Sequence, residues 1–459
     1  MLFQQYYLGC LSHASYLIGD EGTGDAVVVD PQRDVRRYLF DAETHALKIR
    51  HVIETHLHAD FVSGHLELAA ATGADICYGP GAETSFPVRT LGDGERLSLG
   101  EMVLEVRATP GHTPESISIV VWERGAEGDP WGVLTGDTLF VGDVGRPDLT
   151  AGVEPGVTVT DMARHLYRSL RDKLLTLPDA TRVFPAHGAG SACGKNLSTE
   201  TSSTIGDQRV TNHALRLGGE DAFVAAITEG QPAKPHYFAY DARRNRQAGA
   251  LLDESTLPPP LSLDEVLRVQ GAGGVVLDAR PPEDFARAHL KGSINVGLEG
   301  RFAEYAGDVL DPGTPIALVV EYDHRLEAKV RLARIGFDAV VGCLARPLAV
   351  FTDHPELVER SSRLRADELA DRLESGPAPV VIDVRGPGET TAGVVPGAKS
   401  IPLPGLVDEL AELDPEAATV VYCAGGYRSS IAASLLASRG WRDVSDLLGG
   451  YAAWKAWGG

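Results

Sequence analysis

The sequence lacks long apolar runs and any leader-like start. No apolar stretch in the 459-residue sequence approaches the ~18 consecutive residues that a membrane-spanning helix requires. Residues 1–12 have no basic segment followed by an apolar core, so no secretory signal is visible. We therefore expect a cytoplasmic protein with no membrane partner.

Basic charge and cysteine are also scarce. The chain has 42 Lys and Arg against 64 Asp and Glu, a net charge of −22. An anionic surface of this size repels phosphate backbones and anionic lipid, which excludes nucleic-acid and membrane-surface partners. The five cysteines are odd in number and widely spaced, so we expect reduced thiols and no disulfide framework.

The length and an internal repeat predict several domains. At ~150 residues per domain the chain has room for about three. Short β-branched runs alternate with helical patterns up to about residue 230, and a Pro-rich stretch follows. A pattern of about 100 residues then occurs twice, which indicates tandem domains because solenoid repeats are shorter. We expect domains at residues 1–235, 261–355 and 362–459, with an arm and linker at 236–260.

Metal-competent side chains are concentrated after predicted strands of the first domain. His56, His58 and Asp60 lie within five residues, and His112 and Asp137 follow later strands. A hydrogen bond to a carbonyl explains one buried histidine, but it does not explain this whole set, so we predict a metal site. His56 and His58 can face the same side of extended backbone, and the residues alone do not choose between them.

The order of these motifs, completed by Pro185-Ala186-His187, resembles the metallo-β-lactamase superfamily. The resemblance implies an αββα sandwich with the metal at the rim of both sheets, within an α/β multidomain chain. Many members hold two zinc ions and hydrolyse esters or amides, and they carry a histidine directly after the motif's aspartate. Here that position is Phe61, which has no lone pair to offer a second metal.

Within the superfamily this departure resembles the persulfide dioxygenases. Two histidines and one carboxylate with open positions are typical of non-haem iron sites that react with O₂. The resemblance implies one Fe(II) per chain, held by His56, His112 and Asp137. It also implies an outer layer of ligand-orienting residues: His58, Asp60 and His187.

Two further residues are candidates near this site. Arg146, in a Gly-Arg-Pro-Asp loop that resembles the family's substrate side, is expected to contact an anionic substrate group; the alternative is an ion pair with Asp143 or Asp148. Residues 187–206 resemble the bacterial fusion type that carries rhodanese domains. Cys193 in this segment is either a persulfide relay or a small buried apolar residue.

A cysteine loop lies near the C-terminus. Cys423-Ala-Gly-Gly-Tyr-Arg428 stands between a predicted strand and a predicted helix at 429–438. Glycines let successive N–H groups face one point, and the helix N-terminus adds positive potential. Both effects favour a nucleophilic thiolate at Cys423, with Arg428 holding the loop and an anionic sulfur group. A phosphatase-type loop and a buried structural cysteine are the alternatives.

Four residues between Cys and Arg, where a phosphatase loop has five, resemble a rhodanese sulfurtransferase over residues 362–459. Val395 stands where such domains usually have histidine. The first copy has Val320-Glu-Tyr-Asp-His-Arg325 in place of the cysteine loop, and Cys343 lies beyond the next predicted helix. We therefore expect the first copy to lack catalytic activity.

Together these resemblances imply an enzyme of sulfide detoxification. It would oxidise low-molecular-weight thiol persulfides with O₂ to sulfite, and Cys423 would convert sulfite to thiosulfate. A homo-oligomer, dimer or tetramer, is expected. The alternatives are a zinc-dependent thioester hydrolase of the glyoxalase II kind with accessory rhodanese domains, and a non-enzymatic role of the rhodanese pair as a sulfur-binding or scaffold module.

Overall fold

A computed structural model describes residues 1–149, 156–231, 233–374 and 377–458. The chain forms two compact units, Met1–Pro232 with Phe238–Leu252, and Ala233–Tyr237 with Asp253–Gly459. Among the described residues, no helix combines the length and apolar character needed to span a bilayer. All five cysteines fall within these residues and are free thiols, as predicted.

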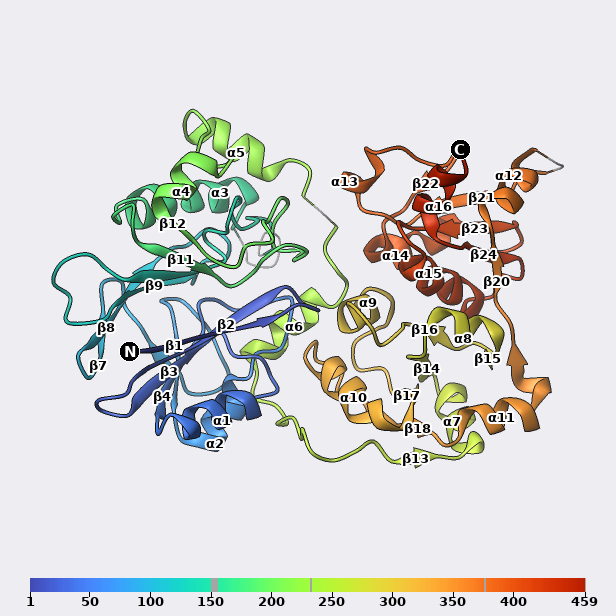
Figure 1. Ribbon diagram of the computed structural model, residues 1–459, viewed down its shortest axis with the longest axis horizontal. Helices are drawn as coiled ribbons and strands as arrows, with labels where there is room; N and C mark the ends of the chain where they lie inside the picture. The colour runs from blue at the N-terminus through green and yellow to red at the C-terminus, as the bar shows by residue number, and fades with distance from the viewer. Residues whose placement is uncertain (150–155, 232, 375–376, 459) are drawn as a thin grey trace. The chain divides into compact units, whose positions relative to one another are not determined.

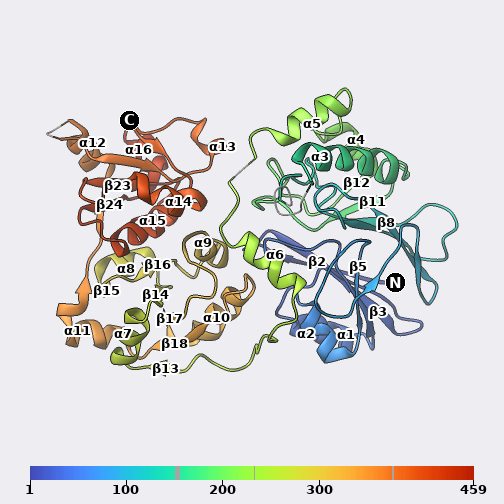
Figure 2. The same ribbon diagram turned by 180° about the vertical axis from the view of Figure 1, so that it is seen from behind.

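The first unit contains two six-stranded sheets, in the orders β1-β2-β3-β4-β5-β6 and β12-β11-β10-β9-β8-β7. Helices α1 and α2 cover the outer face of the first sheet, and α3, α4 and α5 cover that of the second (Figure 1; Figure 2 shows the reverse side). The strands are β1 (Leu2–Leu8), β2 (His13–Asp20), β3 (Asp25–Val29), β4 (Lys48–Ile53), β5 (Asp75–Tyr78), β6 (Arg89–Thr90), β7 (Arg96–Leu99), β8 (Met102–Ala108), β9 (Ile117–Trp122), β10 (Gly132–Gly136), β11 (Arg182–Pro185) and β12 (Ser203–Thr204). The helices are α1 (Arg36–Thr44), α2 (His65–Thr72), α3 (Val159–Arg168, continued by a π-helical turn at Ser169–Leu174), α4 (Ile205–Thr211), α5 (Glu220–Thr228) and α6 (Phe238–Arg246).

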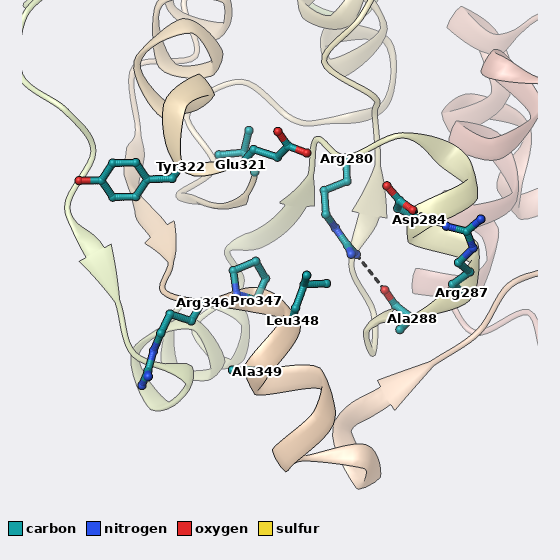
Figure 3. Close-up of a pocket in the computed structure, with 11 residues that line it drawn as sticks. Arg280, Asp284, Arg287, Ala288, Glu321, Tyr322, Arg346, Pro347, Leu348 and Ala349 are labelled. Atoms are coloured by element: carbon teal, nitrogen blue, oxygen red, sulfur yellow. Dashed lines mark hydrogen bonds and ion pairs between the residues drawn. The ribbon is translucent and has the colours of Figure 1, made fainter.

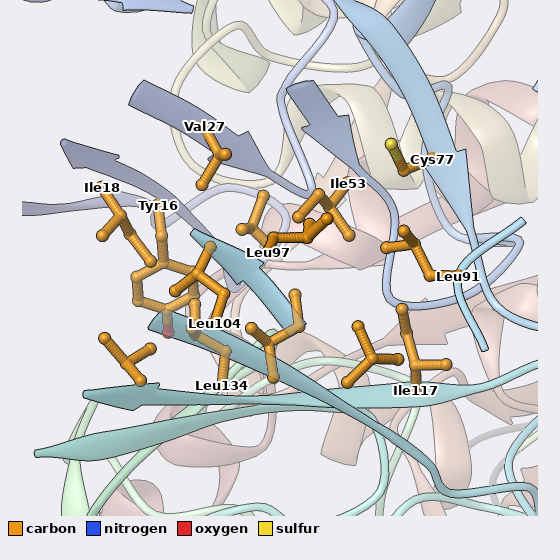
Figure 4. Close-up of a cluster of buried hydrophobic side chains, with 14 of the residues drawn as sticks. Tyr16, Ile18, Val27, Ile53, Cys77, Leu91, Leu97, Leu104, Ile117 and Leu134 are labelled. Carbon is orange, nitrogen blue, oxygen red and sulfur yellow. The ribbon is translucent and has the colours of Figure 1, made fainter. Parts of the chain in front are cut away.

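Alternating side chains build this arrangement. In β3, Val27 and Val29 point into the space between the sheets, whereas Ala26 and Val28 face the helices. Figure 4 shows Val27 of the first sheet packed in one cluster with Leu134 of the second. Strands with both faces buried require apolar residues throughout, as in these runs. The four layers confirm the predicted αββα sandwich.

The second unit contains two five-stranded parallel sheets whose strands follow the same order, β13-β18-β17-β14-β16 and β20-β24-β23-β21-β22. The repeated sequence pattern therefore corresponds to two domains with the same fold. The first copy has β13 (Pro260–Leu261), α7 (Leu263–Gly271), β14 (Val275–Asp278), α8 (Pro282–Arg287), β16 (Ile294–Asn295), α9 (Phe302–Val309), β17 (Ile316–Val319), α10 (Arg325–Ala333), β18 (Val340–Leu344) and α11 (Pro347–Asp353). The second has β20 (Ser362–Leu364), α12 (Ala366–Glu374), β21 (Val380–Asp383), α13 (Pro387–Thr390), β22 (Lys399–Ser400), α14 (Leu406–Glu409), β23 (Thr419–Tyr422), α15 (Tyr427–Ser438), β24 (Val444–Leu447) and α16 (Gly450–Trp457). A two-stranded ribbon pairs β15 (His289–Leu290) with β19 (Val358–Glu359), and short helical turns lie at Tyr322–His324, Pro355–Leu357, Leu403–Gly405 and Leu410–Glu412.

Of the stretch predicted as an arm and linker, residues 236–260, the part Phe238–Leu252 belongs to the first unit and contains helix α6, whereas residues 236–237 and 253–260 belong to the second unit. Only Phe238, Asp241 and Asn245 of this helix are buried, and its last turn carries several arginines. It therefore has no apolar stripe of helical period for a sequence pattern to reveal. Polar contacts of Asn245, described below, help to hold it.

Candidate functional site

The metal-competent residues follow the ends of strands from both sheets. His56 follows β4, His112 follows β8, Asp137 follows β10 and His187 follows β11. Strand ends at the rim of a layered fold bring such residues together although they are far apart in the sequence.

His56, His112 and Asp137 converge on one buried point. The Nε2 atoms of His56 and His112 lie 3.8 and 3.3 Å from Asp137 Oδ2. The His56 Nε2 and Asp137 Oδ2 atoms have no hydrogen-bond partner among the described residues. Buried polar atoms without partners are costly unless a bound group satisfies them. Two imidazoles and one carboxylate around one point therefore fit a metal ion that keeps open positions.

Neighbouring groups fix both histidines in the form that a metal needs. Thr55 Oγ1 donates to an Asp30 carboxylate oxygen at 2.8 Å, so it accepts from His56 Nδ1–H at 3.0 Å. His112 Nδ1 donates to the Arg146 carbonyl oxygen at 2.9 Å. Burial lowers the pKa of both rings, that of His56 well below its usual value. Both imidazoles are therefore neutral, with the Nε2 lone pair free to bind a metal.

His58 lies in a different environment. Its Nε2 atom is 3.1 Å from Asp30 Oδ1 and 3.4 Å from Glu54 Oε2. Burial opposes a charge on this ring, but the two carboxylates outweigh it and raise the pKa of His58 to about 10. A protonated imidazole has no lone pair. The geometry thus favours His56 over His58 as a ligand, a choice that the residues alone left open.

His187 joins two carboxylates. Its Nδ1 and Nε2 atoms lie 2.7 Å from Asp137 Oδ1 and 2.7 Å from Asp60 Oδ2. Burial opposes its protonation, yet the carboxylates raise the pKa of His187 well above its usual value. The ring holds one oxygen of Asp137 and leaves the other facing His56. Next to this network the Phe61 ring packs on His13, with ring centres 4.1 Å apart, so hydrocarbon stands where many relatives have a second-metal ligand.

Arg146 is 1% exposed, and its guanidinium donates to both carboxylate oxygens of Asp148, at 2.7 and 2.9 Å. The predicted substrate contact requires Asp148 to release it, so this role stays a prediction. Cys193 is also buried, and its Sγ belongs to a group of possible ligand atoms with Asp60 and His187, all within 4.8 Å of one another. Burial raises the pKa of the Cys193 thiol well above its usual value, which disfavours a thiolate. Its relay role also stays a prediction.

Asn245, which the sequence did not single out, fastens the metal loop. Its Nδ2 donates to the carbonyl oxygens of His58 and Phe61 at 2.8 and 2.7 Å, and its Oδ1 accepts from Ser63 N–H at 2.9 Å. The contact joins residues more than 180 positions apart. No local pattern signals it, because one asparagine in a polar helix is unremarkable in composition.

The cysteine loop lies between β23 and α15. The N–H group of Gly426, at φ +106°, lies 3.1 Å from Cys423 Sγ. The Tyr451 N–H donates to the Cys423 carbonyl oxygen at 2.7 Å. A Cβ on Gly450 would lie 2.3 Å from that oxygen, so only glycine permits this approach. The glycine pair before Tyr451 therefore supports the loop.

Arg428 faces a partner that the sequence did not suggest. Its two terminal nitrogens donate to the two carboxylate oxygens of Glu389, at 2.7 and 2.6 Å. Glu389 Oε2 also accepts from the Gly386 N–H at 3.0 Å. Val395, at the position where histidine is usual, is buried in the domain core.

The first copy has no cysteine at the equivalent place. Val320, Glu321 and Tyr322 follow β17 there and line a pocket of about 550 Å³ together with Arg280 and Arg346 (Figure 3). No cysteine is among the lining residues that the structure describes. That the first copy lacks catalytic activity stays a prediction.

The first copy of the repeat nevertheless forms hydrogen bonds with the second copy. Asn295 at the end of β16 accepts from the Ser430 hydroxyl at 2.9 Å, and its N–H donates to Ser434 Oγ at 2.9 Å. The Tyr427 hydroxyl donates to the Gly297 carbonyl oxygen. All three partners on the second copy belong to α15, the helix that follows the cysteine loop.

Comparison with known proteins agrees with this architecture. The model of the metallo-beta-lactamase superfamily matches residues 8–187. Hydroxyacylglutathione hydrolase of Rhodospirillum rubrum is 31% identical over 278 residues, which cover 60% of this chain and 92% of that protein. The chain belongs to the metallo-β-lactamase superfamily. The model of the rhodanese-like domain matches residues 262–346 and 365–456, so the metallo-β-lactamase domain is fused to two rhodanese-like domains.

Two further proteins are similar to parts of this chain. The mitochondrial persulfide dioxygenase ETHE1 of Homo sapiens is 28% identical over 239 residues, 51% of this chain and 84% of that protein. A crystal structure of a metallo-beta-lactamase from Staphylococcus aureus superposes with a TM-score of 0.67 at 33% identity, covering 74% of this chain and 98% of that one. Persulfide dioxygenase relatives thus match the half of the chain that holds His56, His112 and Asp137.

Proposed function

We propose that the chain is an Fe(II)-dependent persulfide dioxygenase fused to a thiosulfate-forming sulfurtransferase. The observation that carries the proposal is the convergence of His56, His112 and Asp137 on one buried point, with Phe61 in place of a second-metal ligand. Similarity to persulfide dioxygenases over half of the chain supports it. Two histidines and one carboxylate fit a single iron ion. A pair of zinc ions would lack the histidine that usually binds the second zinc ion, because Phe61 stands in its place.

The net reaction at the metal is R–S–SH + O₂ + H₂O → R–SH + SO₃²⁻ + 2 H⁺. When bound, Fe(II) supplies Lewis acidity and the electrons that O₂ activation requires. Burial keeps both imidazoles neutral, Thr55 and the Arg146 carbonyl fix their tautomers, and His187 fixes the Asp137 carboxylate. The ligand side chains are buried, which limits the access of bulk water.

The second reaction takes place at Cys423. Its thiolate attacks the outer sulfur of a persulfide, forming Cys–S–S⁻ and releasing R–SH. Sulfite then attacks that sulfur, which restores the thiolate and releases S₂O₃²⁻. The N–H of Gly426 stabilises negative charge at Sγ through its 3.1 Å contact. Together the two reactions would remove sulfide-derived persulfides.

The decisive experiment measures O₂ uptake by the Fe(II)-loaded chain with several low-molecular-weight persulfides while sulfite and thiosulfate are quantified. We expect O₂ uptake with sulfite and thiosulfate as products, and thiosulfate formation lost in Cys423→Ser. Retained thiosulfate formation in that variant would remove the sulfurtransferase assignment and favour a scaffold role for the rhodanese-like domains. The cytoplasmic location and a homo-oligomeric state stay predictions.

A zinc-dependent thioester hydrolase is the second candidate, favoured by the relative from Rhodospirillum rubrum named as a hydroxyacylglutathione hydrolase. It requires about two zinc ions per chain, hydrolysis of thioesters and no O₂ uptake. Phe61 argues against the second zinc ion, because its ring offers no lone pair. Metal analysis of the purified protein separates the two candidates directly.

A further inference from the structure

The active-site arginine of the second rhodanese-like domain is already engaged by a carboxylate. The terminal nitrogens of Arg428 donate to both oxygens of Glu389, at 2.7 and 2.6 Å. Two parallel N–H donors of a guanidinium bind other oxyanions in the same two-pronged way. Sulfite and thiosulfate present oxygen atoms of the same kind. A sulfur oxyanion that reaches Arg428 would therefore compete with Glu389 for the same two donors.

The Glu389 side chain is held, but not buried. Its Oε2 atom accepts from the Gly386 N–H at 3.0 Å, and its carbonyl oxygen accepts from Arg385 at 3.3 Å. The side chain is 40% exposed, so its carboxylate has water available if it leaves Arg428. The hydrogen bond from Arg428 holds the pKa of Glu389 below its usual range, and the group is ionised at neutral pH. The Glu389 carboxylate is thus an anion that is already bound to Arg428 and that another anion can displace.

We propose that Glu389 occupies the anion subsite of Cys423 and that oxyanion substrates enter by displacing its carboxylate from Arg428. The inference rests on the sulfurtransferase activity proposed above. Attraction to Arg428 grows with the charge of the incoming anion, so a dianion competes with the Glu389 monoanion better than another monoanion does. Glu389 therefore selects dianionic sulfur acceptors such as sulfite. The persulfide donor does not need this subsite, because it transfers its outer sulfur to Sγ.

The test compares Glu389→Gln with the unaltered full-length chain in sulfur transfer from a persulfide to sulfite without O₂, so that the metal site is silent. The amide retains the size of the side chain and removes the competing charge. We expect the KM for sulfite to fall about fivefold, the factor typical of one partly exposed ion pair. We expect kcat and the KM for the persulfide to change less than about twofold. Small monoanions should also inhibit the variant more strongly.

The matched control is Glu368→Gln, which removes a carboxylate from an exposed pair with Arg365 in the same domain, 3.5 Å apart. Its kinetics should equal those of the unaltered chain. Glu389→Asp serves as a second variant, since its shorter arm loses part of the two-pronged contact; its KM for sulfite should lie between the other two values. It also keeps the test valid if Glu389→Gln does not fold.

The possible outcomes separate the two proposals. A KM for sulfite that is unchanged or raised in Glu389→Gln or Glu389→Asp overturns this inference, and a raised value assigns Glu389 to holding Arg428 in place. If the unaltered chain and Cys423→Ser transfer sulfur at the same rate, the sulfurtransferase activity itself fails, whatever Glu389→Gln does.

Discussion

Thr55→Val should weaken the metal site without touching a metal ligand. Valine has nearly the shape of threonine but no hydroxyl, so His56 Nδ1–H loses its acceptor at 3.0 Å and Asp30 loses a donor at 2.8 Å. An unsatisfied buried donor costs about 1–3 kcal/mol. The His56 ring can avoid that cost by moving its proton to Nε2, and that tautomer cannot bind a metal.

The expected loss is ~10- to 100-fold in metal affinity, the range for partners that orient a ligand from outside, or about 1.4–2.7 kcal/mol. The assay is competition for Fe(II), and for Zn(II) as a redox-inert check, against a chromogenic chelator. Thr181→Val is the control, because that buried hydroxyl has no hydrogen-bond partner among the described residues. Equal affinities in the two variants would refute the argument that Thr55 fixes the tautomer of His56.

Other consequences are testable in the same way. Phe61→His should raise the bound metal towards two ions per chain in elemental analysis; a stoichiometry that stays at one would show that Phe61 does not limit the second position. Asn245→Ala removes three hydrogen bonds from the metal loop and should lower the free energy of unfolding of the first unit by about 2–4 kcal/mol in denaturant titration, with an unchanged value as the contrary result. Removing the metal with a chelator should lower the unfolding temperature of the first unit and leave that of the second unchanged. Tyr427→Phe loses its bond to the Gly297 carbonyl and should destabilise the second unit by about 1 kcal/mol, whereas no loss would mean that water replaces the contact.

The strands, the repeated fold and the cysteine loop could be predicted from the sequence because each leaves a local pattern. Runs such as Val27–Val29 are apolar on both faces, and glycines between Cys423 and Arg428 indicate a turn into a helix. The metal residues were predictable as a set. Their division into ligands and outer partners was not, since it depends on which ring faces Asp30 and which faces Asp137.

Long-range polar contacts account for most of what the sequence could not predict. Asn245 and Glu389 belong to segments without apolar periodicity. Asn245 acts through three hydrogen bonds and Glu389 through two hydrogen bonds with Arg428, all to residues distant in the sequence. Such contacts depend on direction and distance, which composition and spacing do not encode. For the same reason the sequence did not predict helix α6, because a few buried residues hold it in place and it has no continuous apolar stripe.

The hydrogen bonds that Asn295 makes to helix α15 make the stability of the second copy depend on the first. If residues 261–355 were deleted, Ser430 and Ser434 would lose partners that the rest of their own domain does not replace in the same geometry. The hydroxyl of Tyr427, in the cysteine loop, would lose its acceptor as well. A domain without a cysteine at the equivalent place thus still stabilises the domain that carries Cys423. Deleting the first copy would therefore remove support from α15, the helix that follows the cysteine loop.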